Sequence, residues 1–141
     1  MLKPRTIGML EKYDVFTSVK ADAEYVNGTF GTVADGVFTA GAGGYVIMQK
    51  GKGDTLYTDF TVVADEDIRV ADVAKWVGKQ LEVSPLHIEG EFTKGDTLIV
   101  NATGKLAVGD AVAGNVYFEV EEVINFDGVG ALLTIAEEPA V

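Results

Sequence analysis

The sequence predicts a mainly β fold, either a small barrel or a sandwich with short hairpins, with one short α-helix and an extended N-terminal arm. Two observations support this: the chain has 17 glycines in 141 residues, and short β-branched and aromatic runs alternate with Gly, Asp and Asn turns. Hydrophobic residues make up 48% of the chain, enough for a core, and the length indicates one domain. We therefore expect an arm and first strand over residues 1–20 and a single β-rich domain over residues 21–141.

The first 20 residues favour an extended conformation. Pro4 blocks a helix near the start, because proline fixes φ and lacks a backbone N–H. Residues 5–10 could continue as a strand of the domain's own sheet or as a free arm, and both interpretations stay open. Residues 12–20, KYDVFTSVK, roughly alternate β-branched and aromatic residues with polar ones, which predicts the first strand.

Two dipeptides in the next segment predict hairpin turns. Asn27-Gly28 and Asp35-Gly36 are residue pairs that tolerate the positive φ angles of tight hairpins. The small residues of positions 40–44 predict a loop. Further strands are expected over residues 45–48, which we expect to be buried, and over residues 56–64.

One stretch has helical periodicity. Its apolar residues recur at i, i+3, i+4 and i+7, as Val70, Val73, Ala74 and Val77. The acidic residues 65–67 precede it, which suits the positive end of a helix dipole, and Gly78 follows as a stop signal. The pattern predicts a helix of two to three turns over residues 69–78.

Strand signals resume after this helix, separated by Gly, Asp or Asn turns. The expected strands cover residues 80–83, 86–89, 97–100, 115–124 and 131–136. The pentapeptide KGDTL occurs twice, at residues 52–56 and 94–98. In each copy Gly permits an unusual backbone angle and Asp can hydrogen-bond nearby backbone, so we interpret the repeat as one turn used twice.

Residues that commonly carry chemistry are scarce. The chain has no cysteine, one histidine (His87) and two serines. Ser84 and His87 are three positions apart, which places them on opposite faces of a strand, so a nucleophile–base pair is not expected. The acidic run 65–67 lacks the loop pattern of a calcium site. The sequence therefore predicts no catalytic residue, no metal site and no cofactor, and a chain that is not an enzyme.

The charge of the chain limits its partners. The net charge is −11, and no Lys, Arg or His follows Lys105. So acidic a protein is repelled by nucleic-acid phosphates and by anionic lipid surfaces. No apolar run is long enough to span a membrane, and the N-terminus lacks the apolar region of a secretory signal. We expect neither a nucleic acid nor a membrane as partner.

Two segments carry a resemblance to a known family. The first is NGTFGTVADGVFTAG, and the second is FTKGDTLIVNATGKLAVGDAVAGNVYFEVEEV. In their Gly, Ala, Val and Thr content and their NGT, DG, GD and TGK turns, they resemble the small head proteins of tailed bacteriophages, of the capsid decoration (cement) or head-fibre-base type. The resemblance implies a non-enzymatic protein, made in the host cytoplasm, that binds the major capsid protein on the outer face of the virion head and stabilises the shell. It also implies a homo-oligomer, with a trimer favoured.

The resemblance suggests which residues make these contacts. The arm that would contact the capsid contains Lys3, Pro4, Arg5, Ile7, Met9 and Leu10. Because aromatic residues are enriched at interfaces, the expected oligomer interface contains Trp76, Val116, Tyr117 and Phe118. The alternative is another self-associating phage tail, baseplate or surface module. A carrier domain or an enzyme is less favoured, because no lysine lies in the hairpin motif of biotinyl or lipoyl domains.

Overall fold

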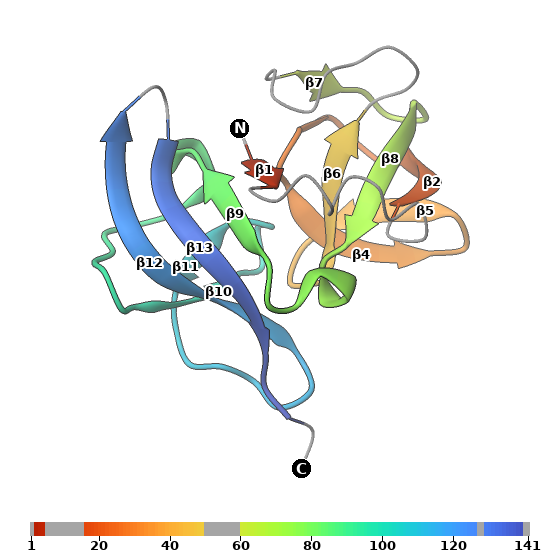
Figure 1. Cartoon of the computed structure of the whole chain (residues 1–141). Helices are drawn as coiled ribbons and strands as arrows, with labels where there is room; N and C mark the ends of the chain where they lie inside the picture. The colour runs from red at the N-terminus through yellow and green to blue at the C-terminus, as the bar shows by residue number, and fades with distance from the viewer. Residues whose placement is uncertain (1, 5–15, 50–59, 127–128, 140–141) are drawn as a thin grey trace.

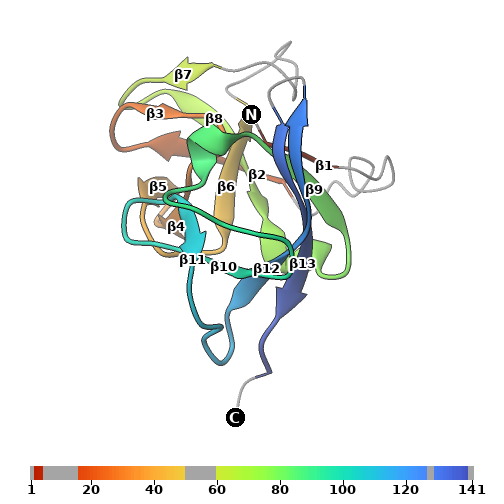
Figure 2. The ribbon, with the colours of Figure 1, turned by 90° about the vertical axis from the view of Figure 1, so that its left-hand side faces the viewer.

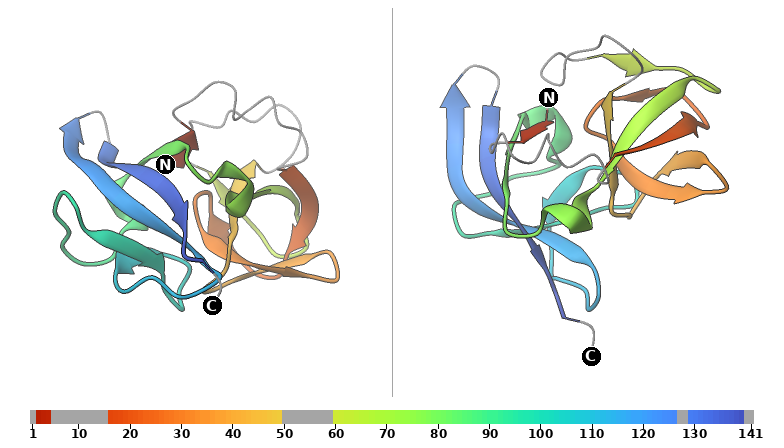
Figure 3. Two further views of the ribbon diagram at one scale, coloured as in Figure 1. Left: turned by 60° about the horizontal axis from the view of Figure 1, so that its bottom comes forward. Right: turned by 45° about the vertical axis from the view of Figure 1, so that its right-hand side comes forward.

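The computed structural model describes residues 2–4, 16–49, 60–126 and 129–139. These residues form a closed five-stranded barrel, a six-stranded antiparallel sheet and a two-stranded ribbon (Figure 1). The mainly β fold predicted from the glycine and turn pattern is therefore confirmed, and the barrel alternative holds for one of the two lobes. Figure 3 shows the barrel and the sheet side by side.

The barrel uses strands from the first half of the chain. Around its circumference the order is β2-β5-β4-β6-β8, with β2 and β5 parallel and the other pairs antiparallel. The strands are β2 (Phe16–Ala21), β4 (Phe30–Ala34), β5 (Val37–Ala40), β6 (Tyr45–Gln49) and β8 (Asp67–Asp72). Beside the barrel, β3 (Tyr25–Val26) pairs with β7 (Thr61–Val62).

The six-stranded sheet combines the first described strand with strands from the second half of the chain. Its order is β1-β9-β13-β12-β10-β11, and every pair is antiparallel. The strands are β1 (Leu2–Pro4), β9 (Gln80–Val83), β10 (Thr97–Val100), β11 (Leu106–Val108), β12 (Val116–Phe126) and β13 (Val129–Glu137). The long pair β12 and β13 runs through the height of this sheet (Figure 2).

One hydrophobic core joins the two lobes. It includes Phe30 and Val46 from the barrel, Trp76 from the connection, and Phe118 and Leu133 from the sheet. Phe30 and Phe118 meet edge to face across the lobes, with ring centroids 5.5 Å apart. Each fully buried side chain of this size stabilises the fold by about 1.5–3 kcal/mol. A second, smaller cluster fills the barrel itself.

The predicted helix over residues 69–78 is wrong. Residues 67–72 form strand β8, held between β2 and β6, and only η3 (Val73–Trp76) is helical, as a short 3-10 turn. The spacing misled because its four residues do not share a buried face: Val70 and Val73 are buried, whereas Ala74 and Val77 are exposed. Valine and isoleucine favour strands, and two neighbouring strands supply the hydrogen bonds. The stop signal was correct, since Gly78 has φ +88°.

The strand expected over residues 86–89 is also wrong. Residues 85–87 form a second 3-10 turn, η4 (Pro85–His87). Pro85 cannot donate a ladder hydrogen bond, but it suits the first position of a helix. Ile88 then makes an isolated bridge with Leu106.

The predicted turns behave in different ways. Asp35-Gly36 closes the β4–β5 hairpin, with φ +52° and +75°. Asn27-Gly28 is a turn, but it does not join a hairpin, because β3 pairs with β7. Asn27 is buried, and its side-chain oxygen accepts a hydrogen bond from Phe60 N at 3.1 Å.

The second KGDTL copy is a turn before β10. Gly95 has φ +90°, and Asp96 Oδ2 accepts a hydrogen bond from Thr93 N at 2.7 Å. The first copy, residues 52–56, lies outside the described residues.

Candidate functional site

The predicted arm is only partly described. Lys3 and Pro4 lie in β1, where they pair with Glu82 and Leu81 of β9 at one edge of the chain's own sheet. The remaining arm residues, Arg5, Ile7, Met9 and Leu10, lie outside the described residues.

The four residues expected at an oligomer interface differ in exposure. Trp76 and Phe118 are fully buried in the shared core, where Trp76 meets Phe16 edge to face with ring centroids 6.0 Å apart. Among the described residues, Trp76 Nε1 has no hydrogen-bond partner. Val116 and Tyr117 are half-buried at the start of β12. Only these last two have side-chain surface that a second copy could contact.

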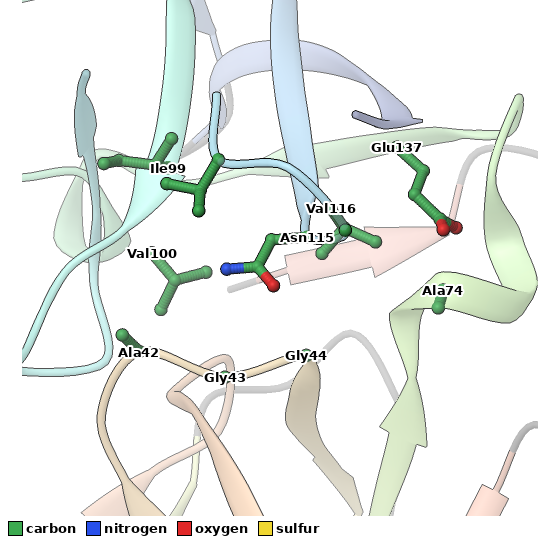
Figure 4. A pocket seen from close by; sticks show the side chains of 11 residues that line it. Ala42, Gly43, Gly44, Ala74, Ile99, Val100, Asn115, Val116 and Glu137 are labelled. Carbon is green, nitrogen blue, oxygen red and sulfur yellow. The ribbon is translucent and has the colours of Figure 1, made fainter. Parts of the chain in front are cut away.

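A pocket of about 420 Å³ lies where the barrel meets the sheet (Figure 4). The barrel contributes the loop of residues 42–44, η3 contributes Ala74, and the sheet contributes the end of β10, the residues before β12 and the end of β13. The lining residues are Ala42, Gly43, Gly44, Ala74, Ile99, Val100, Val112, Gly114, Asn115, Val116 and Glu137. The sequence predicted the small-residue loop, but it gave no sign that these distant segments meet.

Close packing fixes the glycine side of the pocket. A Cβ at Gly43 would lie 2.2 Å from the carbonyl oxygen of Gly31, so only glycine allows the loop to approach β4 this closely. Gly44 O accepts a hydrogen bond from Val73 N at 2.9 Å, which ties the loop to the start of η3. Gly43 and Gly44 contribute no side chain to this wall, and Ala42 contributes only a methyl group.

The opposite wall is a hydrogen-bonded turn. Asn115 N donates to Val112 O at 3.0 Å, Gly114 N donates to Glu138 O at 2.8 Å, and Glu138 N donates to Asn115 O at 3.0 Å. This turn holds the side chains of Asn115 and Glu137 on the pocket lining, as Figure 4 shows. The site is therefore an apolar pocket with one amide and one carboxylate.

His87 and Ser84 lie away from this pocket and are both buried. The His87 ring covers the backbone of Gly28, where an added Cβ would be 2.6 Å from Nε2. His87 N donates to Ser84 O at 3.1 Å as part of η4. The position of His87 is that of a core residue packed against a glycine turn.

A side-chain cluster on the barrel links β3 to β5. The Tyr25 hydroxyl donates to an Asp22 carboxylate oxygen, and Thr39 Oγ1 donates to the other at 3.1 Å. Ala40 N donates to the Tyr25 oxygen at 3.3 Å. Burial raises the pKa of the Tyr25 hydroxyl, and its hydrogen bond to Asp22 raises it further. These contacts fasten the ribbon to the barrel.

The stretch of β12 after Val120 has one edge that has no strand partner among the described residues. Residues 95–98 hydrogen-bond β12 no further than Val120, and no other strand of the described chain pairs with this side of it. Glu121, Glu122 and Val123 are exposed there, with 42% of Val123 accessible. In Figure 1 this end of β12 forms the outer side of the sheet.

Other kinds of site find no support in the part of the chain that the structure describes. No group of three or more His, Asp and Glu residues in it is placed to hold a metal ion. None of its helices has the length and apolarity needed to cross a membrane. Neither a protein-family model nor a curated protein matches the chain.

Proposed function

We propose that this protein is a non-enzymatic structural protein of a virion head, which binds the outer face of the capsid shell of a tailed bacteriophage and stabilises it. The partner is the major capsid protein, and the protein binds as a homo-oligomer, with a trimer favoured. The sequence resemblance supports the class of particle. The observation that carries the protein-binding role is the edge of β12 from Glu121 onward, with which no described strand pairs.

An unpaired edge can accept a strand from another protein. Its backbone N–H and C=O groups can extend the sheet, while exposed side chains select the partner. Here the selection comes from the apolar surface of Val123 and the exposed carboxylate of Glu122, because the Glu121 carboxylate already accepts a hydrogen bond from Thr134 Oγ1 at 2.9 Å. The matching partner segment is extended, with an apolar residue flanked by Lys or Arg. The register of β12 against β13 shifts between Val120 and Glu122 and again between Val123 and Phe126. Such irregularities bend a strand locally, so they limit which partner strands can pair along the edge of β12.

The test is co-sedimentation of the purified chain with heads of the phage that encodes it, prepared without this protein. The wild-type chain should sediment with heads and raise the temperature at which they open. Val123→Lys should weaken binding at least about tenfold, because a lysine on an edge strand opposes pairing. Val63→Lys is the matched control: Val63 is 52% exposed, lies outside the β12 edge and gains the same charge.

Other outcomes separate the alternatives. Sedimentation with tails and not with heads would favour a tail or baseplate module. No association with any particle would overturn the proposal. Deletion of residues 2–10 tests the arm, since unchanged binding would remove these residues from the contact. Sedimentation velocity tests the trimer, and a monomer both at high concentration and on particles would contradict it.

A further inference from the structure

The pocket between the two lobes has a lining that favours positively charged ligands. This inference does not depend on any capsid contact. We propose that the pocket binds a protonated primary amine carried on a short aliphatic stem. The stem would lie among the apolar residues, and the ammonium group would lie against the Glu137 carboxylate. This chemistry is shared by free alkylamines and by the lysine side chain of another protein.

The apolar walls of the pocket suit the aliphatic stem of the proposed ligand. Ile99, Val100 and Val116 line the sheet side, and Ala42 and Ala74 line the other (Figure 4). A pocket of about 420 Å³ is within the usual range for small-ligand sites, roughly 300–1,000 Å³. Apolar walls cannot replace the water around a small inorganic cation, whereas they gain from contact with methylene groups.

The polar groups of the pocket explain why a positively charged ligand is preferred. The backbone N–H groups of Gly114, Asn115 and Glu138 already donate hydrogen bonds within the turn, so they cannot bind an anion. Glu137 contributes two acceptor oxygens and a negative charge, whereas the Asn115 amide both donates and accepts, so the charge preference comes from Glu137. In Figure 4 the Glu137 carboxylate extends from the end of β13 toward Ala74, and the Asn115 amide lies in the middle of the pocket.

The test compares three probes of one stem length: hexylamine, hexan-1-ol and hexanoate. Binding is followed by amide chemical shifts of the ¹⁵N-labelled chain at neutral pH. Hexylamine should bind about three- to tenfold more tightly than hexan-1-ol, a modest preference because Glu137 is exposed to solvent. Hexanoate should bind more weakly than the alcohol. The preference for the amine should decrease as salt is added.

Three variants identify the groups involved. Glu137→Gln should abolish the preference for hexylamine over hexan-1-ol. Glu119→Gln removes the same charge from an exposed residue outside the pocket and should leave the preference intact. Ala74→Phe should weaken the binding of all three probes, because the new ring occupies the pocket. Unchanged amide dispersion and unfolding temperature show that each variant is folded.

Equal affinity for the three probes, no binding of hexylamine, or an amine preference that survives Glu137→Gln would each overturn the proposal. A capped lysine, Nα-acetyl-lysine N-methylamide, separates the two sources of the amine. Binding of both hexylamine and the capped lysine identifies the pocket as a receptor for a lysine side chain. Binding of hexylamine alone identifies it as a site for a free amine.

Discussion

Gly28 is the residue at which local backbone and core packing depend on each other most directly. Its φ of +86° favours glycine, and the His87 ring occupies the space where a side chain would begin. The turn at 27–28 was predicted from the Asn-Gly pair, but its contact with His87 was not, because η4 is almost 60 residues away in the chain.

Gly28→Ala should destabilise the protein more than Gly36→Ala. Both glycines have positive φ, so both substitutions cost about 1–2 kcal/mol of backbone strain. At Gly36 an added Cβ meets no atom within 4 Å, whereas at Gly28 it meets the His87 ring, which should cost about a further 1–3 kcal/mol. Urea unfolding of the two variants measures the difference. Equal losses would show that the ring moves away without cost.

The alkaline limit of stability should involve Lys20 and Tyr25. The Lys20 ammonium donates to Asp67 Oδ1 at 2.9 Å, and this hydrogen bond and the attraction to Asp67 raise the pKa of Lys20 above 10.5. The pKa of Tyr25 is raised above 10.0 by burial and by Asp22. Groups whose pKa is higher in the folded state stabilise it fully below the unfolded pKa, and that contribution is lost as pH rises through the folded pKa.

Stability should therefore fall as pH rises above the ordinary pKa values of the two groups, 10.0 for Tyr25 and 10.5 for Lys20, and through their raised pKa values in the folded protein. The free energy of unfolding, measured by urea at each pH, should depend less steeply on pH in Tyr25→Phe and in Lys20→Gln. Tyr117→Phe, which removes a hydroxyl outside both contacts, should keep the wild-type slope. A wild-type slope in the Tyr25 and Lys20 variants would contradict the assignment.

At the scale of elements, strands were predictable from the sequence where the pattern that specifies them lies within a few consecutive residues. The strands 80–83 and 97–100 have the predicted bounds, because QLEV alternates polar and apolar residues and TLIV is a short run of β-favouring residues. The strands expected over 115–124 and 131–136 are also present, as the longer β12 and β13. The helix over 69–78 failed because tertiary pairing with β2 and β6 decides the conformation of β8.

The candidate site was less predictable than the strands. The loop of residues 40–44 was recognised from its small residues, but the pocket requires that loop to meet β10, β12 and β13, which depends on long-range topology. Likewise, aromatic content alone could not distinguish Trp76 and Phe118, which are buried in the core, from Tyr117, which keeps exposed surface.

The contribution of the second KGDTL turn, residues 94–98, to stability can be tested by substitution of Asp96. Asp96→Ala removes the hydrogen bond from Thr93 N at 2.7 Å and should cost about 0.5–1.5 kcal/mol of unfolding free energy. Asp110→Ala, at an exposed position, should change stability by no more than about 0.5 kcal/mol. Thermal unfolding of both variants gives the comparison. A loss at Asp96 no larger than at Asp110 would mean that Gly95 alone specifies the turn.

At the scale of the molecule, the shared core predicts that the barrel and the sheet unfold together. Side chains of both lobes fill one cluster around Trp76, so neither lobe can open without exposing the other. Trp76 is the only tryptophan, and its fluorescence therefore reports on this junction. In urea, fluorescence and far-ultraviolet circular dichroism should give coincident transitions. Two separated transitions would show that the lobes are independently stable.

The strands of the six-stranded sheet are far apart in the sequence, which affects the order in which they can pair during synthesis. Its edge strand β1 is residues 2–4, its partner β9 is residues 80–83, and the whole barrel lies between them in the sequence. At the usual pace of translation, roughly 5–20 residues per second, β1 is synthesised on the order of 4–16 s before β9. All five barrel strands are synthesised within this interval. Strand β1 therefore pairs with β9 only after all the barrel strands have been synthesised.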